Sequence, residues 1–256
     1  MAAEVAVRAP RAVPAYLAVA VVAAQIAYPL VGGTARQHLA VAIVVLLAGT
    51  YVAHAALTRG PRTALLLVLV TAVPGFAVEV LGVHTGVPFG SYAYSTALGS
   101  RLFGVPPVVG LAWTMLAWPA ALAARRLVRG FAARVVVGAW ALAVADVFLD
   151  PQLVAAGGWS WRGVGAHLPG VPSVPLTNYA GWLAVALVLS VAVQAIAGDG
   201  DDRVPIALYL WLFVGWTVAL AAFLGLPAAA AWGAVAMGTV AVPLALRIRE
   251  RLCRWA

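Results

Sequence analysis

Three acidic residues inside apolar segments are the best candidates for chemistry in this sequence: Glu79, Asp146 and Asp150. A carboxylate within a membrane span costs about 2.5–3.5 kcal/mol on insertion scales, so such a group normally faces the interior of a helix bundle. The i, i+4 spacing of Asp146 and Asp150 places both on one helix face. Carboxyl groups that converge cannot all ionise cheaply, and a protonated acid beside a carboxylate can act as a general acid and base pair.

Structural interpretations stay open for the same acids. Glu79 could form an ion pair with Arg101 or Arg162, and Asp150 could cap a helix or anchor it at the membrane interface. The other five acidic residues are interpreted as solvated groups in the terminal tails and in one hydrophilic turn: Glu4, Glu250, Asp199, Asp201 and Asp202.

Polar and aromatic residues accompany the three acids along the chain. They are His84, Tyr92, Tyr94, Trp159, Trp161, Asn178, Tyr179 and Trp182. We predict an aromatic pocket for a hydrophobic substrate, in which the rings stabilise a developing cation. The alternative is that the Trp and Tyr side chains form an interfacial belt and that His84 is a hydrogen-bonded structural group.

The sequence contains no pattern that indicates a metal or a cofactor. His38, His54 and His167 lack the spacing of metal ligands, and the single Cys253 excludes an internal disulfide and a cysteine metal cluster. A Gly-rich loop after a strand and a nucleophilic Ser or Cys motif are both missing. We therefore expect chemistry without a metal or a cofactor.

The composition identifies the elements that must position these residues. Of 256 residues, 64% are hydrophobic and 9% are charged, against about 25% charged in a soluble domain. A span needs roughly 20 apolar residues. Eight such segments lie near residues 13–31, 38–57, 63–83, 105–124, 131–150, 177–197, 204–224 and 227–246. The sequence therefore predicts an all-α, multi-pass transmembrane helix bundle in the cell membrane, with residues 1–256 as a single domain.

Arginines predict the orientation of this bundle, since the chain has no lysine. With the N-terminus inside, 13 arginines lie on the inner side and three lie outside, which is a strong positive-inside signal. The inner ones are Arg8, Arg11, Arg59, Arg62, Arg125, Arg126, Arg129, Arg134, Arg203, Arg247, Arg249, Arg251 and Arg254. Both termini are predicted to be cytoplasmic. The arginines flank apolar stretches and form no basic face, so nucleic acid is not an expected partner.

This orientation puts the three acids at one level near the outer membrane face. Glu79 lies about one turn below the outer end of the third span. Asp146 and Asp150 close the fifth span, and Pro151 is expected to end that helix. The two longest connections, residues 84–104 and 151–176, also face outward; we expect them to fold back over the bundle or to line a cavity.

Five segments, in order, resemble a carotenoid-biosynthesis membrane family. They are Glu79-Val-Leu-Gly-Val-His-Thr-Gly-Val-Pro-Phe-Gly-Ser-Tyr-Ala-Tyr94; Val105-Pro-Pro with Trp113; Asp146-Val-Phe-Leu-Asp-Pro151; Gly158-Trp-Ser-Trp161; and Pro175-Leu-Thr-Asn-Tyr-Ala-Gly-Trp182. The resemblance covers about residues 70–185. The family includes carotenoid 1,2-hydratases of the γ-carotene 1′-hydratase type and bisanhydrobacterioruberin hydratase. One departure is residues 170–176, where Val-Pro occurs twice instead of once.

The resemblance implies an enzyme, a hydro-lyase that adds water across the terminal isoprenoid double bond of an acyclic carotenoid to give a tertiary alcohol. No redox cofactor is implied. The expected partners are a carotenoid from the lipid phase, water and membrane lipids, with other carotenoid pathway enzymes as further candidates.

If the chain is such a hydratase, Asp146 or Asp150 is expected to protonate the alkene. The remaining carboxylates, including Glu79, are expected to hold and deprotonate the attacking water. The sequence does not separate the acid from the base. Asn178 and Tyr94 are expected to orient the water or the acid. Trp159, Trp161 and Trp182 are expected to line the polyene end.

Two other classes of function stay open. Another cation-forming carotenoid enzyme, such as an end-group cyclase, would need the same acid and aromatic pocket but would exclude water. A transporter, or a protein that only binds lipid or carotenoid, would distribute acids along a transmembrane path, whereas these three acids are predicted at one level. A proton-coupled carrier with a single acidic site stays open. A prenyl transferase is disfavoured, because Asp199-Gly-Asp-Asp202 is a poor version of the aspartate-rich magnesium site that it requires.

Overall fold

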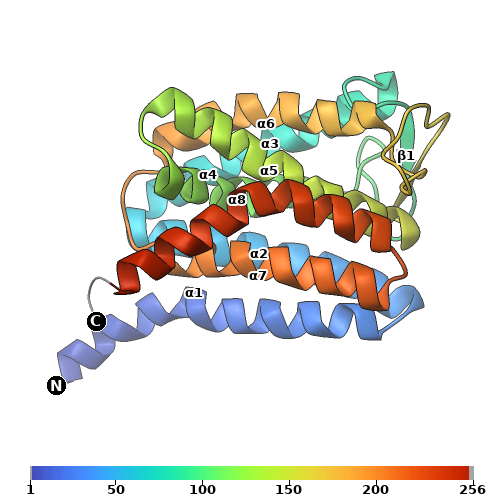
Figure 1. Cartoon of the computed structure of the whole chain (residues 1–256). Helices are drawn as coiled ribbons and strands as arrows, with labels where there is room; N and C mark the ends of the chain where they lie inside the picture. The colour runs from blue at the N-terminus through green and yellow to red at the C-terminus, as the bar shows by residue number, and fades with distance from the viewer. Residues whose placement is uncertain (1, 254–256) are drawn as a thin grey trace.

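Within residues 2–253, eight long helices run along roughly one axis in the computed structural model (Figure 1). They are α1 (Ala2–Ala27), α2 (Gly33–Arg59), α3 (Pro61–Thr85), α4 (Val108–Leu127), α5 (Phe131–Ala155), α6 (Leu176–Ile196), α7 (Arg203–Val218) and α8 (Pro227–Cys253). A 3-10 turn, η1 (Tyr28–Leu30), follows α1, and a π-helical turn, η2 (Ala219–Phe223), follows α7.

The structure describes residues 2–253, and the side chains of residues 12–250 and 253. Glu4, Arg8, Arg11, Arg251 and Arg254, which were considered above, fall outside the described side chains or residues.

All eight helices are long and apolar enough to cross a membrane. The predicted bundle of eight spans is therefore confirmed, and the chain is a multi-pass membrane protein. The last two spans are separate helices, with Gly225 between them at a φ of 67°. Gly60, at a φ of 96°, forms the whole turn between α2 and α3, a conformation that glycine adopts without steric cost.

The helix α4 lies at the centre of the bundle, and α1 lies at its edge. The α4 span is the most buried of the eight and packs against α2, α3, α5 and α7, whereas the α1 span is the least buried and packs mainly on α2. The core is therefore built around α4, and α1 covers one side of it.

Pro151 does not end the fifth helix, contrary to the prediction. The helix α5 continues for four more residues to Ala155. Proline lacks the N–H that would bond the carbonyl of Val147, but membrane helices tolerate this loss because neighbouring groups compensate for the freed carbonyl. Asp146 and Asp150 thus lie inside α5 rather than at its end.

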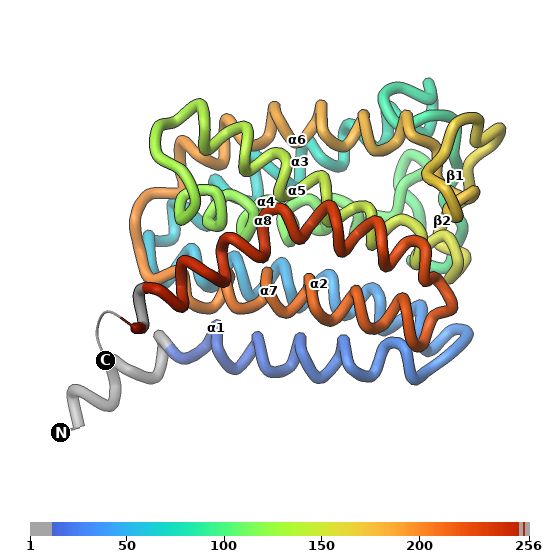
Figure 2. The backbone as a smooth tube through the Cα atoms, in the orientation of Figure 1, coloured from blue at the N-terminus to red at the C-terminus, as the bar shows by residue number. Residues whose placement is uncertain are grey.

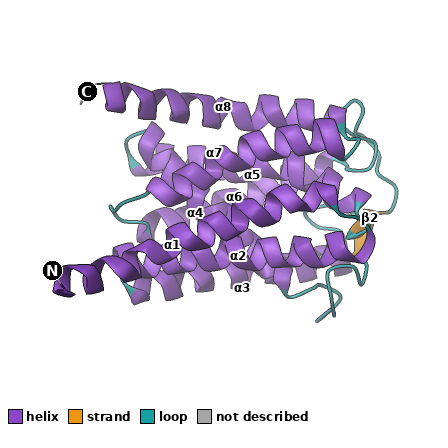
Figure 3. Ribbon diagram, turned by 90° about the horizontal axis from the view of Figure 1, so that it is seen from below, coloured by secondary structure: helices purple, strands orange, loops and turns teal. Residues whose placement is uncertain are grey.

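A small sheet departs from the all-α pattern. The strands β1 (Tyr92–Tyr94) and β2 (Trp159–Trp161) pair antiparallel and lie at one end of the bundle (Figure 2). They come from the two long connections that were expected to fold back, and Tyr92 and Tyr94 are buried. The start of α1 and the end of α8 lie at the opposite end (Figures 1 and 3). That this opposite end is cytoplasmic stays a prediction.

Candidate active site

Asp146 and Asp150 lie one helical turn apart on the buried face of α5, with 0% and 2% of their surfaces exposed. The side-chain amide of Asn178, in the first turn of α6, donates one hydrogen bond to Asp146 Oδ2 at 3.0 Å and another to Asp150 Oδ2. Asp146 Oδ1 has no hydrogen-bond partner among the described residues. One amide nitrogen therefore bridges two carboxyl groups, and two such groups in a buried site cannot both ionise cheaply.

Glu79 lies on the buried side of α3, six residues before the helix ends at Thr85, which is about 9 Å along the axis. The hydroxyls of Tyr92 and Tyr94 both donate to Glu79 Oε2, at 2.6 and 2.9 Å. The indole Nε1 of Trp113 donates to Oε1 at 3.3 Å. All three contacts use the carboxyl group as an acceptor, as an ionised carboxylate requires.

The two-stranded sheet of β1 and β2 supplies four aromatic rings to this end of the bundle. Tyr92 is paired with Trp161 and Tyr94 with Trp159 across the strands. Directly opposed residues share one face of a sheet, and the ring centroids are 5.9 and 5.4 Å apart. Arg101, one of the partners considered for Glu79, donates to the carbonyl of Tyr94 at 2.7 Å.

The two tyrosines of β1 are buried beside the acids. Burial raises the pKa of the Tyr92 and Tyr94 hydroxyls well above their ordinary value, and the charges of Glu79 and Asp150 raise it further. Both hydroxyls are therefore held as neutral donors. The same observation brings Glu79 and Asp150 within electrostatic reach of one pair of phenols.

Two stacked tryptophans pack beside Glu79 and the two-stranded sheet. The rings of Trp113 on α4 and Trp182 on α6 lie 4.0 Å apart and nearly parallel, at 15°. Phe89 packs against both rings. A Cβ atom at Gly75 would come within 2.4 Å of Trp113, so only glycine lets α3 approach the indole this closely. This close approach places the indole N–H against Glu79.

A cavity of about 390 Å³ reaches these groups. Its polar lining at this end consists of Glu79, Asp150, Asn178 and Gln152. Its aromatic lining there comes from Phe89, Tyr92, Tyr94, Trp159, Trp161 and Trp182. Asp146 does not line the cavity and lies behind Asp150, to which Asn178 connects it.

Two of the predicted substrate-binding residues, His84 and Tyr179, do not line the cavity. His84 is exposed in the last turn of α3 and does not line the cavity. Tyr179 follows Asn178 but turns away from the cavity, and its buried hydroxyl has no partner in the described part of the chain. Nor do the described residues bring three His, Cys, Asp or Glu side chains into a metal-binding arrangement.

Sequence reasoning did not assign a role to three residues of this site. Trp113 was noted only within the resembling segments, Phe89 only inside the Glu79–Tyr94 segment, and Gln152 not at all. A Trp in the interior of a span, away from the interfacial belt, is the signal that could have identified Trp113, because an indole N–H inside a membrane needs an acceptor.

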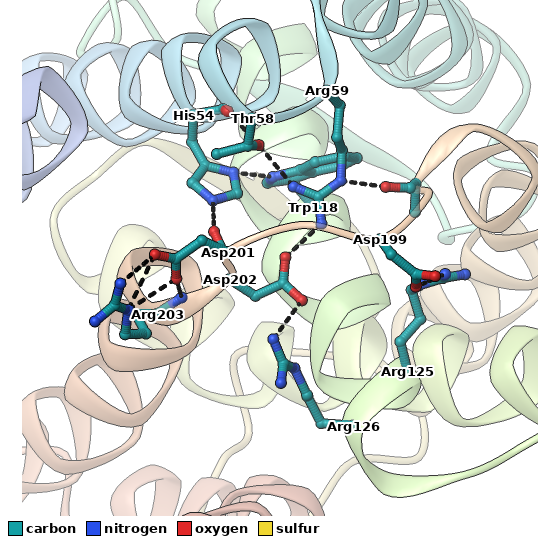
Figure 4. A network of polar contacts seen from close by, with 11 residues as sticks. His54, Thr58, Arg59, Trp118, Arg125, Arg126, Asp199, Asp201, Asp202 and Arg203 are labelled. Atoms are coloured by element: carbon teal, nitrogen blue, oxygen red, sulfur yellow. Dashed lines mark hydrogen bonds and ion pairs between the residues drawn. The ribbon is translucent and has the colours of Figure 1, made fainter. Parts of the chain in front are cut away.

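A second polar cluster lies at the opposite end of the bundle, where the connection between α6 and α7 meets α2 and α4 (Figure 4). Asp202 is buried and accepts hydrogen bonds from Arg59 and, at 3.0 Å, from Arg126. The Arg59 guanidinium also lies 5.1 Å from the ring centroid of Trp118. The interpretation of Asp202 as part of a solvated turn is therefore wrong: two arginines from different helices converge on it.

The neighbouring acids do face solvent, as that interpretation expected. Asp199 is exposed and pairs with Arg125 at 2.7 Å. Hydrogen bonding to Arg203 lowers the pKa of Asp201 to about 2. The backbone carbonyl of Asp201 contacts His54 Nε2 at 2.7 Å. This cluster connects the helix ends and lies away from the cavity.

Comparison with known proteins identifies the family of this chain. No solved structure matches the chain. Over 166 residues the chain is 32% identical to bisanhydrobacterioruberin hydratase of Haloarcula japonica; the match covers 60% of this chain and only 53% of the length of that relative. Residues 39–240 match the family model described as carotenoid biosynthesis protein. The chain therefore belongs to the carotenoid biosynthesis protein family.

Proposed function

We propose that this protein is a carotenoid hydratase, which adds water to the terminal double bond of an acyclic carotenoid end and forms a tertiary alcohol. The observation that carries the proposal is the pair Asp146 and Asp150, bridged by Asn178, at the end of an apolar cavity that Glu79 also lines. Membership of the family and the likeness to a protein named as a hydratase support the same conclusion.

The aspartate pair is suited to supply the proton. An alkene is a very weak base, so it accepts a proton only from a strong donor that is shielded from bulk water. Two carboxyl groups that share a buried site retain one proton between them. Asp150 lines the cavity and Asp146 lies behind it, so we assign Asp150 as the donor to the alkene and Asp146 as its proton-sharing partner.

Glu79 is suited to serve as the base. Protonation of the less substituted alkene carbon leaves a tertiary carbocation, which the surrounding Tyr and Trp rings stabilise electrostatically. A water molecule then attacks the cation, and Glu79 accepts one of its protons. Return of that proton to the aspartate pair completes the cycle, so the net reaction consumes one water and needs no oxidant or reductant.

Pigment analysis tests the assignment directly. The chain is expressed in a bacterial host that makes lycopene, an acyclic carotenoid, and grown in heavy-oxygen water. We expect a hydroxylated carotenoid that carries the heavy oxygen, detected by liquid chromatography and mass spectrometry. An unlabelled isomer of lycopene would indicate a cyclase instead, and unchanged lycopene would exclude both reactions.

Amide variants test the roles of the acids. Positioned proton transfer contributes about 10²–10⁴-fold, so Glu79→Gln, Asp146→Asn and Asp150→Asn are each expected to lower the hydration rate by about that factor. Asp199→Asn, in the exposed loop between α6 and α7, is the matched control and is expected to hydrate at the wild-type rate. Wild-type amounts of product from all three site variants would contradict the mechanism.

A further inference from the structure

The far end of the cavity opens on the side of the bundle, between the end of α1 and the end of α7. Five apolar side chains line the cavity there and are also exposed: Ile26, Leu30, Val214, Val218 and Phe223, with exposed fractions from 51% to 66%. We call these five residues the lateral mouth. An opening rimmed by large exposed apolar side chains within spanning segments faces hydrocarbon rather than water.

The part of the lateral mouth around Ile26 and Val218 lies at about the same depth as the acids. Val218 is five residues from the end of its span at Phe223, and Ile26 is four residues from the end of its span at Leu30. Glu79 is six residues from the end of α3. All three are therefore within about 9 Å of the same membrane face, and the cavity runs sideways from the acids to the lipid.

The inner limit of the lateral mouth is a hydrogen bond between α1 and α7. Gln25 Oε1 accepts from Trp211 Nε1 at 2.7 Å, and both residues line the cavity. From Trp211 to Phe223, twelve residues further along, the cavity follows α7 and then η2, a length of about 18 Å. The lateral mouth thus opens into an elongated groove along α7, which we call the slot. One hydrogen bond, between Gln25 and Trp211, closes the slot toward the bilayer centre.

Two features of α7 leave this slot open. Gly215 lines the cavity, and a Cβ atom there would meet only the Trp211 ring, at 3.6–3.8 Å, which is ordinary contact. The space above Gly215 is therefore part of the cavity. The π-helical turn η2 adds one residue to the last turn, which keeps Phe223 on the side of the helix that carries Val218.

We propose that the lateral mouth is the entrance for the linear isoprenoid chain of the substrate, which slides in from the membrane with one end reaching Asp150 and Glu79 while the rest of the chain stays in lipid. This proposal rests on the proposed function for the identity of the substrate. The cavity has polar groups at the acid end, apolar side chains along the slot and an opening onto lipid. These features match a long apolar molecule with one reactive end. The segment that closes the slot on one side, residues 25–30, lies before the part of the chain that matches the family model.

Filling the slot tests the proposal. The variants Val218→Trp and Gly215→Leu, in lipid nanodiscs that contain lycopene, are expected to lower both bound lycopene, measured by visible absorbance, and the initial hydration rate by about tenfold or more, since an overfilled apolar site excludes its occupant. Val188→Trp is the matched control, because Val188 is 71% exposed on α6 and does not line the cavity. It is expected to behave as the wild type.

The outcomes separate the entrance from the function. Wild-type binding and hydration in both slot variants would overturn the proposed entrance and leave the hydratase assignment intact. Lycopene binding that is lost in the slot variants, with no heavy oxygen incorporated by the wild type, would support the entrance and contradict the hydratase. If one slot variant fails to fold, as judged by size-exclusion chromatography, the other carries the test.

Discussion

Asn178 is the residue on which the acid pair depends, since its single amide nitrogen donates to both Asp146 and Asp150. Leaving buried polar groups without a partner costs about 1–3 kcal/mol. We expect Asn178→Leu, which is similar in size but cannot donate, to lower the hydration rate by roughly tenfold to a hundredfold. The measurement is the initial rate in nanodiscs at equal amounts of folded protein.

Ser190→Ala is the control for this variant. Ser190 is buried on the same helix, and its hydroxyl has no partner among the residues that the structure describes. The loss of this hydroxyl is expected to leave the hydration rate unchanged. An Asn178→Leu protein as fast as Ser190→Ala would show that the bridge between the aspartates is not needed for turnover.

The acids of the site could be selected from the sequence, because a carboxyl group inside an apolar span is rare and the i, i+4 spacing of Asp146 and Asp150 fixes their common face. The position of His84 could not be fixed by proximity along the chain. It follows Glu79 by five residues, or about 140° around a helix, so the two side chains point in different directions. Proximity in the sequence therefore assigned His84 to the site, although the helix directs this residue away from the cavity.

At the scale of elements, the spanning helices could be predicted from the sequence and the two-stranded sheet could not. Runs of about 20 apolar residues identify membrane helices by length alone, and Tyr92–Tyr94 and Trp159–Trp161 are too short to show the alternation that identifies a strand. The burial of Asp202 was also out of reach, because it depends on Arg59 and Arg126 arriving from two other helices. What is missing in both cases is long-range pairing, which local composition does not encode.

The cluster around Asp202 is expected to hold together the ends of α2, α4 and α7 that lie opposite the acid site. Its ion pair with Arg59 is buried, with 4% and 7% of the two side chains exposed. Removing one partner of a buried pair costs about 3–5 kcal/mol, because the other charge is left uncompensated. We therefore expect Asp202→Ala to lower the free energy of unfolding by about that amount, measured by denaturant titration in mixed micelles.

Asp199→Ala is the matched control for this element. Asp199 also pairs with an arginine, Arg125, but its side chain is fully exposed, and solvent screens such pairs. No measurable change in the free energy of unfolding is expected. Equal stability of the two variants would contradict a fastening role for Asp202, whereas a full hydration rate in folded Asp202→Ala would agree with its distance from the cavity.

At the scale of the whole molecule, polar groups are divided between the two ends of the bundle. The acid site and the two-stranded sheet occupy one end, and the Arg59–Asp202 cluster occupies the other. This second end is the one at which α1 starts and α8 finishes (Figures 1 and 3). The arginine count predicts that this second end is cytoplasmic. Among the described residues one cavity reaches Asp150, so under the proposed function and entrance the substrate presents only one of its ends at a time.

This geometry makes the order of products a test of the whole arrangement. A long, stiff polyene cannot reverse within about 390 Å³, so a symmetric acyclic carotenoid must leave and re-enter before its second end reacts. With lycopene in excess, we expect the singly hydrated product to accumulate first and the doubly hydrated product to follow after a lag, as measured by liquid chromatography over time.

An isotope chase checks the same point. When labelled lycopene is chased with unlabelled singly hydrated product, the doubly hydrated product should carry diluted label. Doubly hydrated product that forms from the first turnovers without a lag and keeps its full label through the chase would mean that both ends react without release, which one acid site behind one lateral mouth does not allow.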